Sequence, residues 1–524
     1  MSLLRRVVSA LFLSALAAGA AAAQPEEILG TVSFPNSCAE SAQPQLQRAV
    51  ALLHSFWWEQ ADLAFRDVLD RDPSCAIASW GVATVAIGNP FGAGAAPAAA
   101  TKALAAIAQG REIGAKTERE RGYIEAIAAY YDRFGERTHG ARLRSVADAF
   151  EALALKYPDD DETQIFFALY LTATQPPTDK TLARAMPAAV ILNQQFAKHP
   201  DHPGAAHYLI HSNDFPAIAE QGLAAAMCYA QIAPSSPHAL HMPSHIFTRV
   251  GLWQQSADTN QRSVDAAKRA NGITDQLHAY DYMVYAYLQL ARDKDAWRAV
   301  ESARSLAEQN RAADYAREAI PARFAVERGA WGEAAQLGDP DASKFPYTSA
   351  IRIFARALGA ARGGDPEAAG RDLRRLQDIG TTLNATKEEY WVAEVQVQEL
   401  AAQGWIANAK GDHDQALSLM RAAADKEDLS EKSGISPGRL LPARELLGDL
   451  LLQNGRPADA LLEYEASLKR DPRRFRSYWG AGQAAAAAGN AGRAHYYYGL
   501  LVEVAGNGDP RPELASAREY LAAH

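Results

Sequence analysis

The sequence has few of the residues, and none of the short motifs, that most often reveal an activity. Only three of its 524 residues are cysteines, and strand-like alternation of apolar and polar residues is scarce. No H-E-x-x-H pair, glycine-rich phosphate loop or G-x-S-x-G elbow occurs, so common signatures of zinc proteases, nucleotide-binding enzymes and α/β-hydrolases are missing. The formal charge of −9, with both signs mixed along the chain, argues against a nucleic-acid partner.

The first 23 residues have the pattern of a cleavable export signal. Two arginines precede an apolar run, and small residues lead up to Ala23 and Gln24, as at a signal-peptidase site. The run is short and rich in alanine for a membrane helix, and no other long apolar segment occurs. We therefore expect a signal peptide over 1–23, an N-terminal extension over 24–43, and a periplasmic or secreted protein that is not inserted in a membrane.

The three cysteines suit such an oxidising compartment. Cys38 and Cys75 could pair, which would tie the N-terminal segment to the first helices. Cys228 would then remain free, and we interpret it as a small apolar residue buried on a helix.

Helical periodicity dominates the rest of the chain, and it carries a 34-residue period. Gly489 follows Gly455 by 34 residues, and Pro234 follows Pro200 by the same interval. Near the C-terminus, small residues fall where two helices of a pair would touch, with Tyr464 filling the contact. A period of this length predicts stacked helix pairs, roughly ten to twelve of them. The expected divisions are N-terminal helix pairs over 44–200, histidine-rich repeats over 201–300 and C-terminal repeats over 301–524.

Three segments interrupt this register. Residues 89–98 and 175–180 are rich in glycine, proline or polar residues and are predicted loops. Residues 425–438 are interpreted as an insertion, because Gly411 and Gly455 are 44 residues apart instead of 34.

By these features the chain resembles the tetratricopeptide repeat (TPR) superfamily over most of its mature length. Three strings, LLHSFW at 52–57, HPGAAHYLIH at 202–211 and HMPSHIF at 241–247, are also similar to those of a group of exported bacterial TPR proteins of largely unassigned role. The resemblance implies an all-α solenoid that forms a right-handed superhelix. It also implies a scaffold that binds a protein or peptide segment in its concave groove.

Two histidine pairs lie one repeat apart. His207 and His211 are four residues apart, as are His241 and His245, and the offset between the pairs is 34 residues. Residues four apart share a helix face, and helices of neighbouring repeats pack roughly 8–10 Å apart. Four neutral imidazoles meeting at one point would suit a divalent transition metal such as zinc or copper. We therefore predict a metal site here, which His278 could close as a further ligand.

The repeat register adds candidate neighbours. With Gly251 as the turn glycine, a first helix would run from His238 to about Val250. The resemblance to TPR proteins then implies that His238, Thr248 and Asp214 line the concave groove as ligand-contacting residues. Ligating histidines usually donate their second nitrogen to an oxygen acceptor, and Asp214 and Asp281 are the predicted acceptors.

Several interpretations remain open from the sequence. The groove binds a peptide or small molecule, the histidines hold a metal, or they pack between repeats. A metal-dependent enzyme with an open coordination position is an alternative built on the second, but the sequence identifies no catalytic residue and no cofactor other than this metal. His54 could face a groove, whereas His199 and His202 lie in a proline-containing turn and are interpreted as structural.

Overall fold

The solenoid consists of helices that pair with their neighbours in sequence. The structure is a computed structural model that describes residues 27–386 and 388–524, so the predicted signal peptide lies outside the described residues. Within these ranges, every regular element is a helix, and successive helices pack against each other along the chain. This arrangement confirms the predicted all-α solenoid of TPR-like helix pairs.

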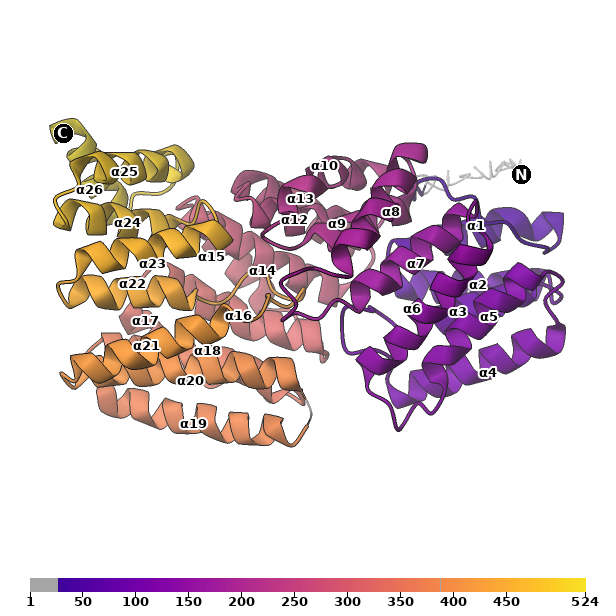
Figure 1. Cartoon of the computed structure of the whole chain (residues 1–524), viewed down its shortest axis with the longest axis horizontal. Helices are drawn as coiled ribbons and strands as arrows, with labels where there is room; N and C mark the ends of the chain where they lie inside the picture. The colour runs from indigo at the N-terminus through magenta and orange to yellow at the C-terminus, as the bar shows by residue number, and fades with distance from the viewer. Residues whose placement is uncertain (1–26, 387) are drawn as a thin grey trace, which may run out of the picture.

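The helices fall into three groups along the chain (Figure 1). The N-terminal helices are α1 (Gln43–His54), α2 (Trp58–Arg71), α3 (Ala76–Val85), α4 (Pro97–Ile113), α5 (Glu118–Tyr131), α6 (His139–Lys156), α7 (Asp161–Ala173) and α8 (Ala185–Lys198), preceded by the 3-10 turn η1 (Glu40–Ala42). The middle of the chain forms α9 (Pro203–Asn213), η2 (Ala219–Gly222), α10 (Leu223–Ile232), α11 (Pro237–His241), α12 (Pro243–Arg249), α13 (Trp253–Arg269), α14 (Ile273–Gln289) and α15 (Asp293–Arg304). The C-terminal helices are α16 (Arg311–Glu327), α17 (Trp331–Ala335), α18 (Pro346–Arg362), α19 (Pro366–Asn384), α20 (Glu389–Ala409), α21 (His413–Glu427), α22 (Ala443–Gln453), α23 (Pro457–Arg470), α24 (Phe475–Ala487), α25 (Ala491–Ala505) and α26 (Pro512–Ala523).

The repeat signals in the sequence have direct structural causes. Gly455 and Gly489 end the turns before α23 and α25 at φ values of 71° and 74°, a conformation that glycine adopts without strain. The ring of Tyr464 lies between α22 and α24, where a Cβ on Gly448 or Gly480 would come within 2.9 or 2.2 Å of its Cζ atom. The small residues of the repeat therefore make room for this ring.

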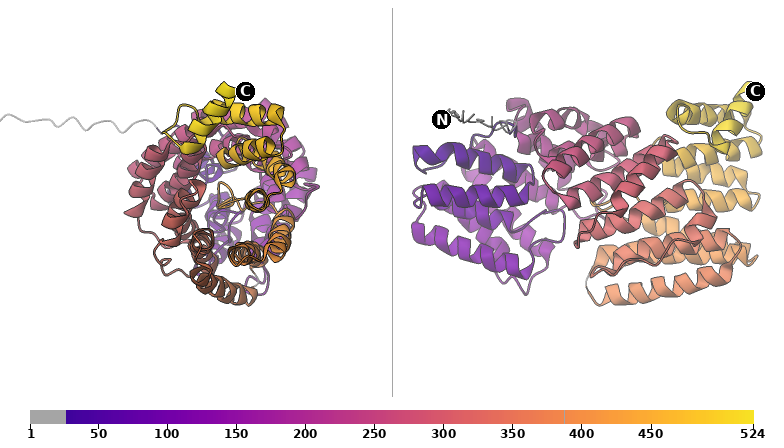
Figure 2. Two further views of the ribbon diagram at one scale, coloured as in Figure 1. Left: turned by 90° about the vertical axis from the view of Figure 1, so that its left-hand side faces the viewer. Right: turned by 180° about the vertical axis from the view of Figure 1, so that it is seen from behind.

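The C-terminal helices curl back onto the middle of the chain. The Trp253 indole donates to the Arg473 carbonyl at 2.8 Å, and the Asp509 amide donates to the Ala291 carbonyl at 2.7 Å. Seen end-on, helices surround a central axis (Figure 2). The histidine-bearing helices α9, α12 and α14 lie between the two ends of the molecule (Figure 1), and His207, His241 and His245 are buried.

The predicted insertion is a loop, residues 428–442, between α21 and α22. It reaches from the C-terminal helices toward the N-terminal ones (Figure 1). The Glu431 amide donates to the Pro177 carbonyl at 2.9 Å, and the Lys180 ammonium lies 2.6 Å from the Glu431 carboxylate. The predicted loop at 175–180 and the predicted insertion therefore meet.

The structure joins Cys38 and Cys75 in a disulfide, with their Cα atoms 4.7 Å apart. This bond fastens the extended N-terminal segment to the start of α3. The interpretation of Cys228 is wrong, because this free cysteine is exposed. It lies on α10, on the side of the helix that solvent reaches.

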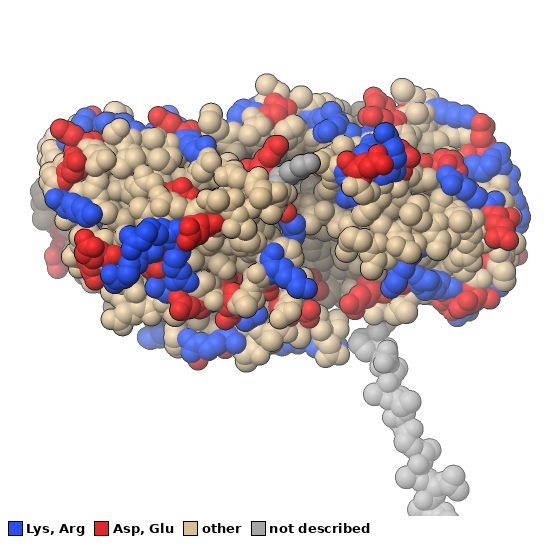
Figure 3. Space-filling view, turned by 90° about the horizontal axis from the view of Figure 1, so that it is seen from below, with Lys and Arg blue, Asp and Glu red and all other residues tan. Residues whose placement is uncertain are grey.

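The outer surface carries positive and negative side chains in alternation (Figure 3), without a continuous basic face in this view. Among the described residues, no helix is long and apolar enough to cross a membrane.

Candidate metal centre

The predicted helix from His238 to Val250 is broken in the middle. It forms α11 and α12, which meet at Met242 and Pro243. Pro243 has no N–H to donate to the preceding turn, and a proline inside a helix kinks or breaks it. Instead of one four-histidine site, six histidines form two adjacent groups of three, and within each group one nitrogen per residue lies within 4.8 Å of the others.

The first trio consists of His207 and His211 from α9 and His238 from α11. The Nδ1 atom of His207 lies 2.6 Å from the backbone oxygen of His54 and donates to it. Its Nε2 atom lies 3.2 Å from Nε2 of His238. The trio therefore leaves one buried nitrogen, Nε2 of His211, without a hydrogen-bond partner among the residues that the structure describes.

The second trio consists of His241 and His245, on either side of the helix break, and His278 from α14. The Nδ1 atom of His241 lies 2.7 Å from Oδ1 of Asn260, and the Nδ1 atom of His245 lies 2.9 Å from Oδ2 of Asp214. Asn260 must accept from His241, because its amide nitrogen donates to the Ser256 carbonyl at 2.7 Å. Both Nδ1 atoms are therefore donors.

These bonds fix the protonation of the facing nitrogens. Because Nδ1 carries the proton in His241 and in His245, the Nε2 atom of each neutral ring presents a lone pair, and the two Nε2 atoms lie 3.1 Å apart. Burial and neighbouring histidines lower the pKa of His241, and burial also lowers that of His245 although Asp214 opposes it. Two neutral rings would thus face each other with lone pairs, an arrangement that a shared cation stabilises. Ligands on a tetrahedral zinc ion, with bonds of about 2.0–2.1 Å, are separated by about 3.3 Å.

The same protonation pattern extends to the other members. Burial is the main cause that places the pKa of His207, His211, His238 and His278 well below 6.5. Neutral imidazole is the form that ligates metals. His278 also leaves a buried Nδ1 atom without a partner among the described residues, so each trio contains one orphaned nitrogen, which is costly unless something binds it.

Aromatic rings hold the first trio in place. The Phe91 ring, from the predicted loop 89–98, stacks on His211 with centroids 4.0 Å apart, and Tyr229 stacks on His207 at 5.2 Å. Phe56 lies edge-on to His207 at 4.4 Å and stacks on His238 at 5.5 Å. His211 in turn lies 5.8 Å from His245 between ring centroids. The three strings that mark the resemblance to exported TPR proteins, at 52–57, 202–211 and 241–247, therefore meet at one place.

Charged groups adjoin the second trio on one side. Besides His245, the Asp214 carboxylate accepts from the Arg249 guanidinium at 2.7 Å and from the Lys432 ammonium at 3.2 Å. Lys432 comes from the loop 428–442 and is almost fully buried, and this burial lowers its pKa to about 8. Sequence reasoning predicted Asp214 as an acceptor but missed Lys432, whose only signal was the irregular spacing of the insertion.

Two predicted residues lie elsewhere. Asp281 does not support a histidine, because its Oδ1 atom accepts from the guanidinium of Arg323 at 3.1 Å. Thr248 does not line an open groove, since it is buried and its hydroxyl lies 3.2 Å from that of Ser256. Arg323 in turn donates to the Gly438 carbonyl, so Asp281 helps to hold the loop 428–442.

A third cluster of metal-ligand types is a closed hydrogen-bond network. The buried Glu162 carboxylate accepts from Nε2 of His54 at 2.9 Å and from Nε2 of His202 at 3.0 Å. Nδ1 of His202 accepts from the Ala205 amide and caps α9, while Nδ1 of His54 lies 3.0 Å from the Tyr208 hydroxyl. Because every ring nitrogen has a partner, we interpret this cluster as structural. His199, which pairs with Asp161 at 2.7 Å, also has a partner.

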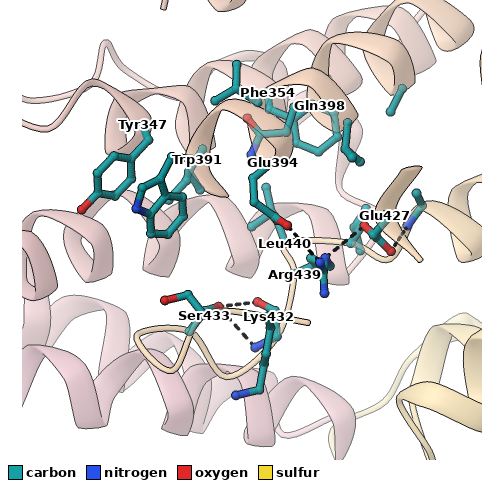
Figure 4. Close-up of a pocket in the computed structure, with 18 of the residues that line it drawn as sticks. Tyr347, Phe354, Trp391, Glu394, Gln398, Glu427, Lys432, Ser433, Arg439 and Leu440 are labelled. Carbon is teal, nitrogen blue, oxygen red and sulfur yellow. Dashed lines mark hydrogen bonds and ion pairs between the residues drawn. The ribbon is translucent and has the colours of Figure 1, made fainter. Parts of the chain in front are cut away.

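A small cavity of 40 Å³ lies on the other side of the loop 428–442. Tyr347 and Trp391 stack there with ring centroids 3.9 Å apart, and Arg439 pairs with Glu394 at 2.9 Å. Lys432 extends from the loop away from Trp391 and Glu394 (Figure 4). Lys432 therefore both lines this cavity and contacts Asp214 beside the second trio.

Comparison with known proteins adds little about function. No family model and no curated protein matches the sequence. Solved structures that match include a tetratricopeptide repeat protein from Parabacteroides merdae, with 10% identity and a TM-score of 0.24 over 77% of this chain and 98% of that one. Yeast Tom70 matches with 12% identity and a TM-score of 0.34 over 92% and 95%. Cut9–Hcn1 of the APC/C matches with 12% identity and a TM-score of 0.29 over 92% and 96%. Scores this low say nothing of a ligand or partner, and the fold assignment rests on the helix pairs themselves.

Proposed function

We propose that the protein binds transition-metal ions through the two histidine trios inside its solenoid. The observation that carries the proposal is the pair of facing Nε2 atoms of His241 and His245, 3.1 Å apart, with both Nδ1 atoms engaged as donors. A cation is the simplest partner for two lone pairs in a buried site. The ligands are neutral nitrogens, which suit copper, zinc or nickel, and copper(II) forms the tightest complexes of the divalent series.

The surroundings of the trios support a metal more strongly than a peptide. His207, His241 and His245 are at most 2% exposed, and the loop 428–442 lies beside them. A peptide in the predicted concave groove would have to displace this loop and its buried contact between Lys432 and Asp214. A scaffold role, which the TPR-like fold also suggests, would therefore use other surfaces of the solenoid.

Elemental analysis of the full-length protein, expressed without a histidine tag, tests the proposal. We expect stoichiometric copper or zinc after exposure to either metal and removal of excess. The variants His207→Ala and His241→Ala should each lose bound metal, whereas His495→Ala, an exposed histidine on α25, should not. Equal metal content in wild type and both site variants would refute the proposal, provided that circular dichroism shows the variants to be folded.

A further inference from the structure

The two trios are not separate sites, because their rings adjoin. The ring centroids of His211 and His245 lie 5.8 Å apart, and those of His238 and His241 lie 6.0 Å apart, although each pair joins different trios. Within the trios, the ring pairs that contact each other have centroids between 4.4 and 6.4 Å apart. The spacing across the boundary is thus the same as the spacing inside. All six imidazoles form one continuous cluster.

We propose that this cluster is a dinuclear centre that holds two copper ions, one in each trio, bridged by a small oxygen anion such as hydroxide. The inference rests on the proposed metal binding and specifies its stoichiometry and its further ligand. Paired metal ions that share an oxygen ligand lie about 3.5–4 Å apart in proteins. Adjacent trios with the ring spacing described above can bring two ions into that range.

The coordination number of each metal ion requires a ligand besides the three histidines. Each trio supplies three nitrogens, and sites with three protein ligands characteristically keep a position for water or another small molecule. His238 and His278, one from each trio, are only partly buried, unlike the inner histidines. Both rings lie next to His241, with centroids 6.0 and 4.4 Å away, so we place the open positions, and the ligand that contacts both ions, beside these more accessible rings.

Charge calls for that ligand to be an anion. All six protein ligands are neutral, so two divalent ions would bring four positive charges into a buried site. The nearest carboxylate, Asp214, already contacts Arg249 and Lys432, and it approaches the centre only through His245. Uncompensated buried charge is costly. A bridging hydroxide, formed when a bound water releases a proton to solvent, would offset part of this charge.

Copper(II) loading of the full-length, untagged protein tests the dinuclear centre. We expect two copper ions per chain and an integrated EPR intensity well below the total copper, because bridged copper(II) ions couple magnetically. His211→Ala and His278→Ala each remove one ligand from a different trio. Each should reduce bound copper to one per chain and restore the full EPR intensity, and His495→Ala should behave as wild type.

The outcomes separate this inference from the proposed function. One copper per chain in wild type, or two coppers with the full EPR intensity, would overturn the dinuclear centre and leave metal binding intact. No bound copper or zinc would overturn both. Azide, as an anion probe, should bind once per pair of coppers, and independent binding of one azide to each copper would overturn the bridge. Testing His211→Ala and His278→Ala on different helices keeps the result interpretable if one of them fails to fold.

Discussion

Asp214 connects the histidine centre to the loop that covers it, and replacing it with asparagine tests this connection. The carboxylate contacts Nδ1 of His245, Arg249 and Lys432 at 2.9, 2.7 and 3.2 Å and is 9% exposed. Asp214→Asn preserves the shape of the side chain and removes its charge. Lys432 then loses its counter-ion, and Arg249 keeps only Glu431 at 3.6 Å. His245 loses the carboxylate that makes its ring a better ligand.

Two losses of different origin are expected from Asp214→Asn. Removing one partner of a buried ion pair costs about 3–5 kcal/mol of stability, so the free energy of unfolding of the metal-free protein should fall by that amount. Removing the carboxylate behind a ligating histidine weakens metal binding by about 10–100-fold. Urea unfolding measures the first loss, and competition with a chromophoric chelator measures the second.

Asp281→Asn is the matched control. Asp281 is fully buried and pairs with Arg323 at 3.1 Å, but it hydrogen-bonds to no histidine among the described residues. We expect a similar loss of stability, about 3–5 kcal/mol, with unchanged metal affinity. Equal affinities for wild type and Asp214→Asn would refute the reasoning, as would an equal loss of affinity in the two variants.

Three further predictions concern single interactions. Exchanging both Cys38 and Cys75 for serine should lower the free energy of unfolding by about 4 kcal/mol. This is the loss of chain entropy expected for a disulfide with a sequence separation of 37. An unchanged midpoint of urea unfolding would contradict it. Burial lowers the pKa of His139 to about 4, so only the unfolded chain binds its proton between pH 6.5 and 4. Stability should therefore fall by up to about 3 kcal/mol as the pH drops through that window, and an identical pH dependence in His139→Gln would disprove it. Asn260→Asp retains an acceptor for Nδ1 of His241 and should bind metal nearly as tightly as wild type. Asn260→Ala has no such acceptor and should bind metal about tenfold more weakly. Equal metal affinities of the two variants would count against the proton assigned to Nδ1 of His241.

The helix pairs and the histidine faces were predictable because they depend on local periodicity. A 34-residue period and small residues around Tyr464 are enough to indicate stacked helix pairs. A spacing of four puts His207 beside His211 on one face of a helix, whatever surrounds it. Asp214 was predictable for the same reason, since the repeat register places it one turn from His211.

The grouping of the histidines was not predictable, because it depends on how α9, α11, α12 and α14 pack together. His238 of α11 joins the α9 pair, and His278 of α14 completes the second trio with His241 and His245. The hydrogen-bond acceptor of His207 could not be predicted either. It is the backbone oxygen of His54, and every residue type has such an oxygen.

The sequence by itself thus determined the repeat architecture and the set of histidines, through spacings that act within one or two helices. Only the tertiary structure decided that these residues form two adjoining trios, next to the charged side chains of Asp214, Arg249 and Lys432. Lys432 reaches Asp214 from 218 residues away, because the solenoid curls round until its C-terminal helices meet the middle of the chain. No local pattern contains that closure, since it is the sum of small rotations between many packed helix pairs.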